Sequence, residues 1–457
     1  MRQMDFEINT KCIERLTEKI GDERNAEVAA DVATYVQLPL MDRKRAPEGV
    51  TAPDLAVVSV DGGRFQVRDF DSPKAGKSKD AKKDAKTKRG AKKGAKKDAN
   101  ESPAAETSAA TATATAAKAS SASAATDEEK PEPDAEHKGT HWREDKIGLL
   151  MTMASQAQAT DPCPELPPTF GNPTRIVTLV REMKTKKSAT VTHDGEEQAA
   201  PSKFSAEDEE AGKGERGALH GGSAGEPVRW QPPKVVDKEH VATQEKWAEF
   251  GPVVAQAAWK LGFYGAARKA FVADGSDNNW SMWKNHFSSF TPILDIIHAI
   301  SYVFAAATAG RPFKEGWQVY LRWVTWVWQG SVEKVVAELA ARQAELGLPQ
   351  ESDGDTHPRV VVTTALGYLQ NHKGKMRYAE YRREGLPITS SYVESAVKQF
   401  NRRVKGSEKF WTRRGAESLL QLRADNLSGA KVMAGFWDRR QARATGLNSY
   451  PQQSVAA

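Results

Sequence analysis

Three carboxylates occupy positions where the sequence predicts that a strand ends or a helix begins. Asp61 follows the apolar run AVVSV and precedes two glycines and a second alternating run, a pattern that predicts a hairpin over residues 55–70. Asp274 follows the apolar run KAFVA, and Glu394 lies in the first turn of the helix expected after TSS at residues 389–391. Each has a simpler explanation, because aspartate favours turns and caps and glutamate stabilises the first turn of a helix.

The chemistry of these groups depends on whether the fold brings them together. The carboxyl ends of neighbouring strands in an α/β sheet form a shared crevice. Clustered carboxylates repel one another unless cations lie between them, and hard oxygen ligands favour Mg²⁺ or Mn²⁺. Two such ions about 4 Å apart can assist the attacking and the leaving oxygen in phosphoryl transfer. The pattern therefore predicts two Mg²⁺ (or Mn²⁺) ions held by Asp61, Asp274 and Glu394.

A second candidate pair, Asp295 and His298, lies in ILDIIHA at a predicted strand-to-helix junction. The spacing can place both side chains near the carboxylates, where His298 contacts DNA or a phosphate, or orients Asp295. Alternatively, the pair only ties the start of the helix to the sheet. A zinc site is not expected, because no second His or Cys lies at ligand spacing.

Basic residues follow Glu394 along the predicted helix and its continuation. Residues 373–414 carry a balance of +8 and residues 74–99 carry +9, so the remaining residues carry −11 in a chain of net charge +6. Two basic blocks on an acidic body favour a polyanionic partner over a merely solvated surface. We expect phosphates of double-stranded DNA to contact a set of six basic side chains: Arg402, Arg403, Lys405, Lys409, Arg413 and Arg414.

Helical periodicity dominates the rest of the sequence. Residues 1–36 read as helical with a break at Gly21-Asp22, residues 312–372 as helical throughout, and residues 174–183 as a strand or short helix. The run KIGLLMTM predicts a further strand of the sheet. Four tryptophans at helical spacing predict core packing, with base stacking as the alternative: Trp317, Trp323, Trp326 and Trp328.

Four stretches resemble the DDE-class transposases of bacterial insertion sequences, and most closely their Mutator-like, ISKra-type branch. The four stretches are VVSVDGGRFQVR, KAFVADGSDNNW, ILDIIHA with its Asp-x-x-His element, and LPITSSYVESAVKQFNRRVKGSEKFW. The last of these is the most specific, and HWREDKIGLL and DPCPELP are also similar to that family.

The resemblance implies an RNase H-like core in which Asp61, Asp274 and Glu394 form the metal triad and Asp295 and His298 are auxiliary. It implies that a metal-activated water cleaves DNA at the element's end and that the freed 3′-hydroxyl attacks target DNA. Because two ends must be held together, a homodimer or higher oligomer on DNA is expected. Two alternatives stay open: an inactive, transposase-derived DNA-binding protein, and an RNase H-like nuclease that cuts without joining.

The expected fold class is α/β, with an RNase H-like mixed sheet flanked by helices and two kinds of insertion. The expected organisation is an N-terminal helical segment at 1–45 (a candidate remnant of a DNA-binding region), a first core part at 46–70 and 141–310, a disordered Lys/Ala-rich insertion at 71–140, a flexible polar insertion at 184–235, a helical insertion domain at 311–375, a second core part with the glutamate helix and basic segment at 376–430, and a C-terminal tail at 431–457.

Composition limits the compartment. The 457-residue chain has no apolar stretch of the roughly 20 residues that cross a bilayer and no apolar signal core at its start, so no membrane partner is expected. Its two cysteines exclude a disulfide framework and fit a reducing cytoplasm. With a DNA partner, this predicts a cytoplasmic, nucleoid-associated protein.

Overall fold

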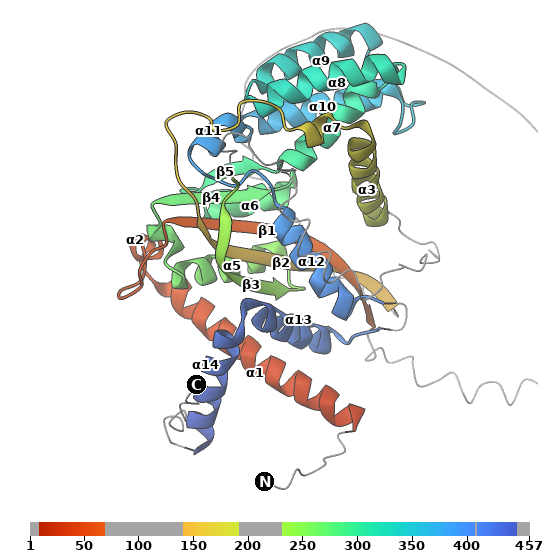
Figure 1. Cartoon of the computed structure of the whole chain (residues 1–457). Coiled ribbons are helices and arrows are strands. Elements are labelled where there is room, and N and C mark those ends of the chain that lie inside the picture. The colour runs from red at the N-terminus through yellow and green to blue at the C-terminus, as the bar shows by residue number, and fades with distance from the viewer. Residues whose placement is uncertain (1–8, 69–139, 192–230, 407–408, 446–457) are drawn as a thin grey trace, which may run out of the picture. The chain divides into compact units, whose positions relative to one another are not determined.

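The computed structural model describes residues 9–68, 140–191 and 231–445, except 407–408 (Figure 1). By its internal contacts the chain divides into two units, one of residues 1–67 and 142–457 and one of residues 68–141. The first unit holds the sheet and the helices described below. Almost all of the second unit, and with it the predicted insertion at 71–140, lies outside the described residues.

A mixed five-stranded sheet organises the first unit. Its order is β3-β2-β1-β4-β5, with β1, β4 and β5 parallel and β2 and β3 antiparallel. The strands are β1 (Leu55–Arg68), β2 (Thr140–Ala154), β3 (Lys234–Thr243), β4 (Arg268–Ala273) and β5 (Thr291–Leu294). The predicted α/β class is therefore confirmed as a mixed sheet flanked by helices.

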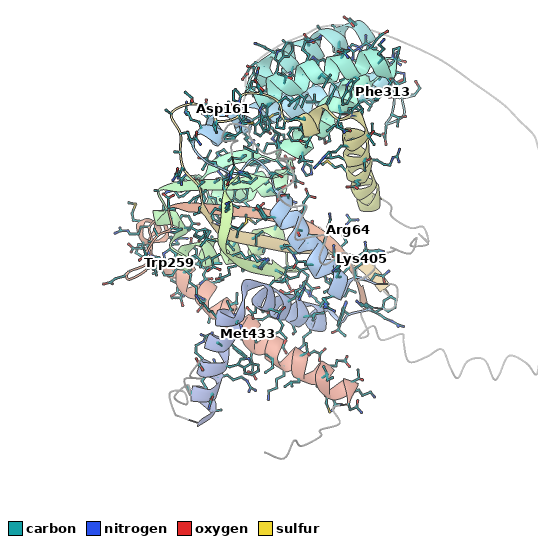
Figure 2. All side chains as sticks on the ribbon, in the orientation of Figure 1. Arg64, Asp161, Trp259, Phe313, Lys405 and Met433 are labelled. Carbon is teal, nitrogen blue, oxygen red and sulfur yellow. The ribbon has the colours of Figure 1, made fainter. Side chains whose placement is uncertain are left out.

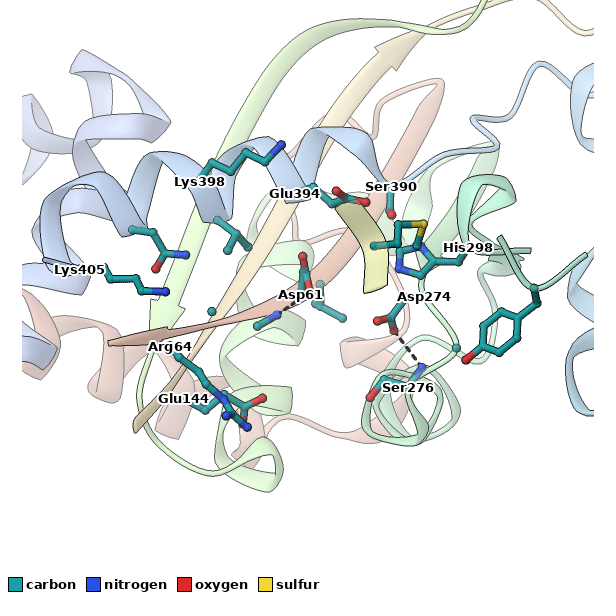
Figure 3. Close-up of a pocket in the computed structure, with 18 of the residues that line it drawn as sticks. Asp61, Arg64, Glu144, Asp274, Ser276, His298, Ser390, Glu394, Lys398 and Lys405 are labelled. Atoms are coloured by element: carbon teal, nitrogen blue, oxygen red, sulfur yellow. Dashed lines mark hydrogen bonds between the residues drawn. The ribbon is translucent and has the colours of Figure 1, made fainter. Parts of the chain in front are cut away.

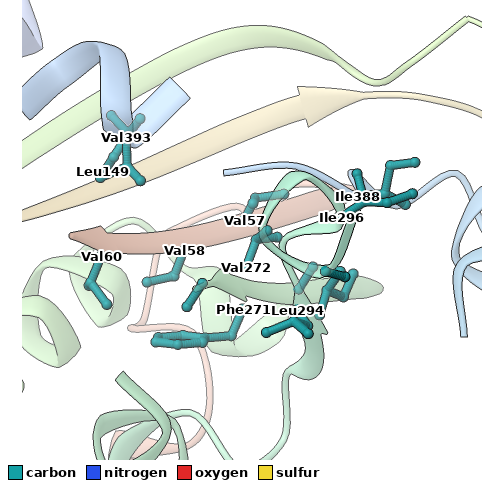
Figure 4. Close-up of a cluster of buried hydrophobic side chains, with 14 of the residues drawn as sticks. Val57, Val58, Val60, Leu149, Phe271, Val272, Leu294, Ile296, Ile388 and Val393 are labelled. Carbon is teal, nitrogen blue, oxygen red and sulfur yellow. The ribbon is translucent and has the colours of Figure 1, made fainter. Parts of the chain in front are cut away.

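The core of the sheet is built from short, almost uninterrupted apolar runs, as expected for strands covered on both faces. Val58 pairs in register with Phe271, and both are fully buried. Figure 4 shows Val58, Val60 and Phe271 on one side of the sheet and Val57 on the other, towards Val393 of the helix α12 (Ser391–Val404). Alternation along the strand then decides which residues face α12.

The register of β1 and β4 places two of the predicted site residues. Ser59 lies opposite Val272, and its hydroxyl donates to the Val272 carbonyl at 2.6 Å. Asp61 lies two residues further along β1, and Asp274 is the residue directly after the end of β4. Because side chains alternate with a period of two along a strand, Asp61 shares the face of Ser59, and Asp274 lines the same pocket as Asp61.

Helices cover both faces of the sheet (Figure 1). Helix α1 packs on α13 and α5, α13 packs on β3 and α12, and α6 packs on β4 and α5. These helices are α1 (Thr10–Gln37), α5 (Trp247–Lys260), α6 (Asp277–His286), α13 (Arg413–Ser428) and α14 (Ala430–Thr445), with the short α2 (Leu40–Arg43) and α11 (Tyr378–Arg383).

A separate group of helices extends from the end of β5 (Figure 1). Helix α7 packs on α8, α10 and α3, and α9 packs on α8 and α10. Trp323 and Trp328 are buried in this group and Trp317 and Trp326 are half-buried, so the core interpretation of the tryptophans is confirmed. The helices are α3 (Pro173–Val191), α7 (Ile296–Thr308), α8 (Phe313–Trp328), α9 (Val332–Leu346) and α10 (Pro358–His372).

The predicted hairpin at Asp61 is wrong, because β1 runs straight through Asp61, Gly62 and Gly63. Neither glycine has a positive φ, so neither serves a turn. Instead, the absence of a side chain at both glycines lets carboxylates of β2 approach the β1 backbone closely. A Cβ on Gly62 would lie 3.0 Å from the Glu144 carboxylate, and one on Gly63 would lie 2.7 Å from that of Asp145. The two glycines therefore mark close approach rather than chain reversal.

Several other element predictions are corrected. Residues 174–183 are helical, which is one of the two predicted alternatives, but helix α3 continues into the polar insertion predicted at 184–235. Strand β3 also begins within that predicted insertion. Helices do not run throughout 312–372, since residues 347–357 connect α9 to α10. Much of the predicted tail at 431–457 is helix α14, which packs on α13 and buries Phe436. Edge strand β3 was missed because most of its first residues are exposed and polar.

The predicted break at Gly21-Asp22 is also wrong, because α1 is continuous from residue 10 to 37. Gly21 is needed for packing: a Cβ there would lie 2.4 Å from Cβ of Ser418 and 2.6 Å from its backbone.

We expect Gly21→Ala to lower the free energy of unfolding by about 1–3 kcal/mol, because α1 and α13 must separate. Gly367→Ala in α10 is the control, since nothing lies within 4 Å of its Cβ. Urea unfolding should show that variant to be more stable by about 0.5–1 kcal/mol.

Candidate functional site

One pocket gathers the predicted chemistry. It lies beside the second half of β1 and the loop after β4, with α12 along one side, and has a volume of about 560 Å³ (Figure 3). Its lining includes all three predicted carboxylates, Asp61, Asp274 and Glu394. Asp61 lies on β1 and Asp274 directly follows the parallel strand β4. In α/β sheets, ligand crevices form outside the carboxyl ends of the strands.

Each carboxylate has a different local anchor. Asp61 Oδ1 accepts the Gly62 amide at 2.8 Å. Asp274 Oδ1 accepts the Ser276 amide at 2.9 Å and the Asn279 side-chain amide at 2.7 Å. Glu394 lies in the first turn of α12, and Figure 3 shows its side chain extending toward Ser390 and His298. All three carboxylates line the same pocket.

Burial and the charges of the neighbouring carboxylates both raise the pKa of Asp61. The pKa of Asp61 is raised from its ordinary 3.8 to about 7, mostly by burial and also by the nearby charges of Asp274 and Glu394. The Gly62 amide and His298 act in the opposite direction. A carboxylate so destabilised by its neighbours is stabilised when a cation joins the group. The donor set therefore fits hard divalent cations.

Asp295 ties three elements together. It follows β5 and caps α7, where its Oδ2 accepts the His298 amide at 3.2 Å and contacts the His298 ring Nδ1 at 2.6 Å. Its Oδ1 accepts the Ser390 amide at 3.0 Å, just before α12. The side chain is fully buried. Asp295 thereby links the sheet and α7 to the helix that carries Glu394.

His298 lines the pocket and lies near the charges of Asp274 and Glu394. Burial alone would lower the pKa of His298, but the Asp295 bond and the charges of Asp274 and Glu394 raise it. Burial alone would likewise raise the pKa of Asp295, and the contact with His298 lowers it instead. The pair therefore ties the start of α7 to the sheet, and His298 lines the pocket. Contact of His298 with DNA or a phosphate stays a prediction.

The set of candidate metal ligands that the described residues bring within 4.8 Å of one another does not include Asp61 or Asp274. One ligand atom each from Asp295, His298 and Glu394 lies within 4.8 Å of the others. Both oxygens of Asp295, however, already accept hydrogen bonds from Ser390 and His298. Asp295 therefore suits a supporting role better than a direct one.

The six predicted DNA-binding residues separate into groups. Lys405 is the one of the six among the described residues that line the pocket. Arg402 and Arg403 are exposed at the end of α12, and Lys409 donates to the Arg402 carbonyl at 3.2 Å. At the start of α13, Arg413 pairs with Glu245 at 2.9 Å and Arg414 pairs with Asp22. Their partners make Arg413 and Arg414 the weakest candidates for phosphate contact.

Several pocket residues were not predicted. Lys398 and Asn401 lie four and seven residues after Glu394, so helical spacing alone could have placed them on its face, together with Lys405. Arg64 reaches the pocket from β1, and Figure 2 labels it close to Lys405. Tyr302 and Tyr368 stack at 3.8 Å between ring centroids and form another wall. Nothing in sequence spacing connects these two tyrosines, because they come from α7 and α10.

Removing the charge of Asp61 should stabilise the metal-free protein at high pH. Its raised pKa means that the folded state binds this proton more tightly than the unfolded chain, so stability falls as pH rises from about 4 to 7. We expect Asp61→Asn to raise the free energy of unfolding by about 2 kcal/mol at pH 8, a value reduced for the partial exposure of the side chain, and by little at pH 4. Urea unfolding in EDTA measures both, with exposed Asp277→Asn as control. Equal changes at the two pH values would contradict the assignment.

Among the described residues, none of the helices is long and apolar enough to cross a membrane. No family model matches the chain, and neither does any curated protein or solved structure.

Proposed function

We propose that this protein is a DDE-type transposase with an RNase H-like core, which cleaves DNA and transfers the strand in a metal-dependent reaction. The observation that carries the proposal is that Asp61, Asp274 and Glu394 line one pocket, just beyond the last registered pair of β1 and β4, Ser59 and Val272. The sheet order β3-β2-β1-β4-β5, antiparallel at one side and parallel at the other, supports the RNase H-like assignment.

Asp61, Asp274 and Glu394 are the residues that would hold two Mg²⁺ ions. When bound, Mg²⁺ supplies Lewis-acid stabilisation of the charge that develops on phosphoryl transfer. Asn279 and the Ser276 amide orient Asp274 by binding its Oδ1. Asp295 orients the His298 ring through Nδ1 and fixes the start of α12, which sets the position of Glu394.

The proposed substrate is double-stranded DNA. Lys398, Lys405 and Arg64 place positive charge along one end of the pocket, next to the carboxylates (Figure 3). Phosphates entering there would meet cations first and the carboxylate cluster beyond them. Such contacts position a duplex without reading its sequence.

The test of the function is a strand-transfer assay with Mn²⁺ and a pre-cut DNA end, run beside a cleavage assay. Cleavage with joining supports the transposase. Cleavage of RNA–DNA hybrids without joining would indicate a nuclease, and DNA binding without Mn²⁺ binding would indicate an inactive DNA-binding relative.

The pocket cations should determine the salt dependence of DNA binding. We expect the double variant Lys398→Gln/Lys405→Gln to bind duplex DNA more weakly at every salt concentration. The slope of log K against log[salt] should become less steep by about 2, one for each lost phosphate contact. Fluorescence anisotropy over a salt series measures the slope. Exposed Lys314→Gln on α8 is the control and should leave it unchanged, and an unchanged slope in the double variant would remove the pocket from the DNA interface.

A further inference from the structure

Tyr368 of helix α10 lies against the loop that carries Asp274. A Cβ built on Gly275, the residue after Asp274, would lie 2.2 Å from Tyr368 Cε2 and 2.8 Å from both Cζ and the hydroxyl oxygen. Gly275 is not among the glycines with a positive φ, so its backbone conformation does not itself require glycine. The ring of Tyr368 imposes that requirement, because it occupies the space that a side chain would fill.

The Tyr368 ring is held in place by two other aromatic rings. It stacks on Tyr302 of α7 with 3.8 Å between ring centroids, and it lies edge-on to His372 at 4.8 Å. The Tyr368 hydroxyl is buried and has no hydrogen-bond partner among the described residues. The phenol therefore supports Gly275 by ring contact and not by a hydrogen bond.

The end of α10 also contacts the helix that follows the loop. His372 is buried, and its ring centroid lies 5.9 Å from that of Trp280 on α6. The ammonium of Lys375, just after α10, lies over the Trp280 ring at 4.5 Å from its centroid. The loop at residues 274–276 and the start of α6 are thus both braced by one helix of the group that extends from β5.

We propose that Tyr368 is a positioning residue for Asp274: its ring fixes the Gly275 backbone and thereby keeps the Asp274 carboxylate in the pocket as a metal ligand. Asp274 Oδ1 accepts the Ser276 amide and the Asn279 side chain, and these bonds close the loop around Gly275. A shift of Gly275 would therefore move the carboxylate. The inference rests on the proposed function, because it takes Asp274 to be a metal ligand.

The first test is a double-mutant cycle on Mn²⁺ affinity, measured by electron paramagnetic resonance. Gly275→Ala should weaken binding at least about tenfold, because the new methyl group and the ring cannot both fit. Tyr368→Ala should weaken it about tenfold, because the loop loses its support. In the Tyr368→Ala background, Gly275→Ala should change the affinity by less than about twofold, since the methyl group then has room. Tyr368→Phe keeps the ring and should restore the wild-type affinity.

The second test follows the loop without metal, by hydrogen exchange and mass spectrometry in EDTA. The peptide that contains the Ser276 amide should exchange faster in Tyr368→Ala and in Gly275→Ala than in the wild type or Tyr368→Phe. Leu369→Ala is the control for a general loss of packing, because Leu369 is the next residue of α10 and is fully buried. It should leave both the exchange of this peptide and the Mn²⁺ affinity unchanged.

Three results would overturn the inference: multiplied losses of affinity in the double variant, unchanged loop exchange in Tyr368→Ala, or equal effects in Leu369→Ala. Mn²⁺ binding that survives Tyr368→Ala would also overturn it and leave the proposed function standing. If the wild type binds no Mn²⁺, the proposed metal-dependent function fails instead. The exchange pattern then decides by itself whether Tyr368 positions Asp274.

Discussion

Asp274→Asn should abolish DNA cleavage and strand transfer while leaving the fold and DNA affinity intact. The asparagine keeps the Oδ1 atom that accepts the Ser276 amide and Asn279, so the loop after β4 retains its hydrogen bonds. Only the negative charge and one oxygen ligand are lost. We expect both rates to fall at least about 10³-fold, or about 4 kcal/mol of activation free energy.

The same variant should lose Mn²⁺ binding at the triad, which electron paramagnetic resonance measures directly. Asp277→Asn provides the control, because Asp277 is exposed in the first turn of α6 only three residues away. The affinity for duplex DNA should stay within about threefold of the wild type, because Asp274 is not one of the positively charged residues that contact phosphates. Full strand-transfer activity in Asp274→Asn would contradict the triad, and a matching loss in Asp277→Asn would show a structural effect instead.

Asp295→Ala should give the largest loss of stability among the pocket residues. It removes the acceptor for the backbone amides of His298 and Ser390 and for the His298 ring, all from a fully buried position. Leaving a buried histidine and two amides without their partner costs about 3–5 kcal/mol. Asp295→Asn keeps an oxygen acceptor and should cost about 1–2 kcal/mol. Urea unfolding in EDTA provides both values, with exposed Asp355→Ala within about 0.5 kcal/mol of wild type.

The pH dependence of that loss separates a salt bridge from a neutral cap. The pKa of Asp295 is lowered and that of His298 is raised by their contact. The stabilisation from Asp295 is present above its unfolded pKa, and that from His298 is present below its own. The penalty of Asp295→Ala should therefore be greatest between about pH 4 and 6.5 and should become smaller as the pH rises through the raised pKa of His298. A penalty that is constant over this range would show that the histidine stays neutral.

The sequence by itself determined which residues could do chemistry and roughly which elements carry them. Short apolar runs predict β4 before Asp274 and β5 before Asp295, because a strand covered on both faces is apolar throughout. A helix start before Glu394 follows from the Thr389–Ser391 run, and helical spacing from Glu394 also reaches Lys398 and Lys405. These signals are local, and local patterns are what a sequence displays directly.

Only the tertiary structure decided what the glycines of β1 do and which residues meet across the pocket. Asp-Gly-Gly is turn chemistry in isolation, yet Gly62 and Gly63 remain extended because Glu144 and Asp145 of β2 occupy the space that side chains would fill. Gly21 likewise lies within the continuous helix α1, where Ser418 of α13 occupies the space that a side chain would fill. Asp145, Asn401 and the Tyr302–Tyr368 stack depend on segments far apart in the chain. Their proximity follows from strand register and helix packing, which no local pattern specifies.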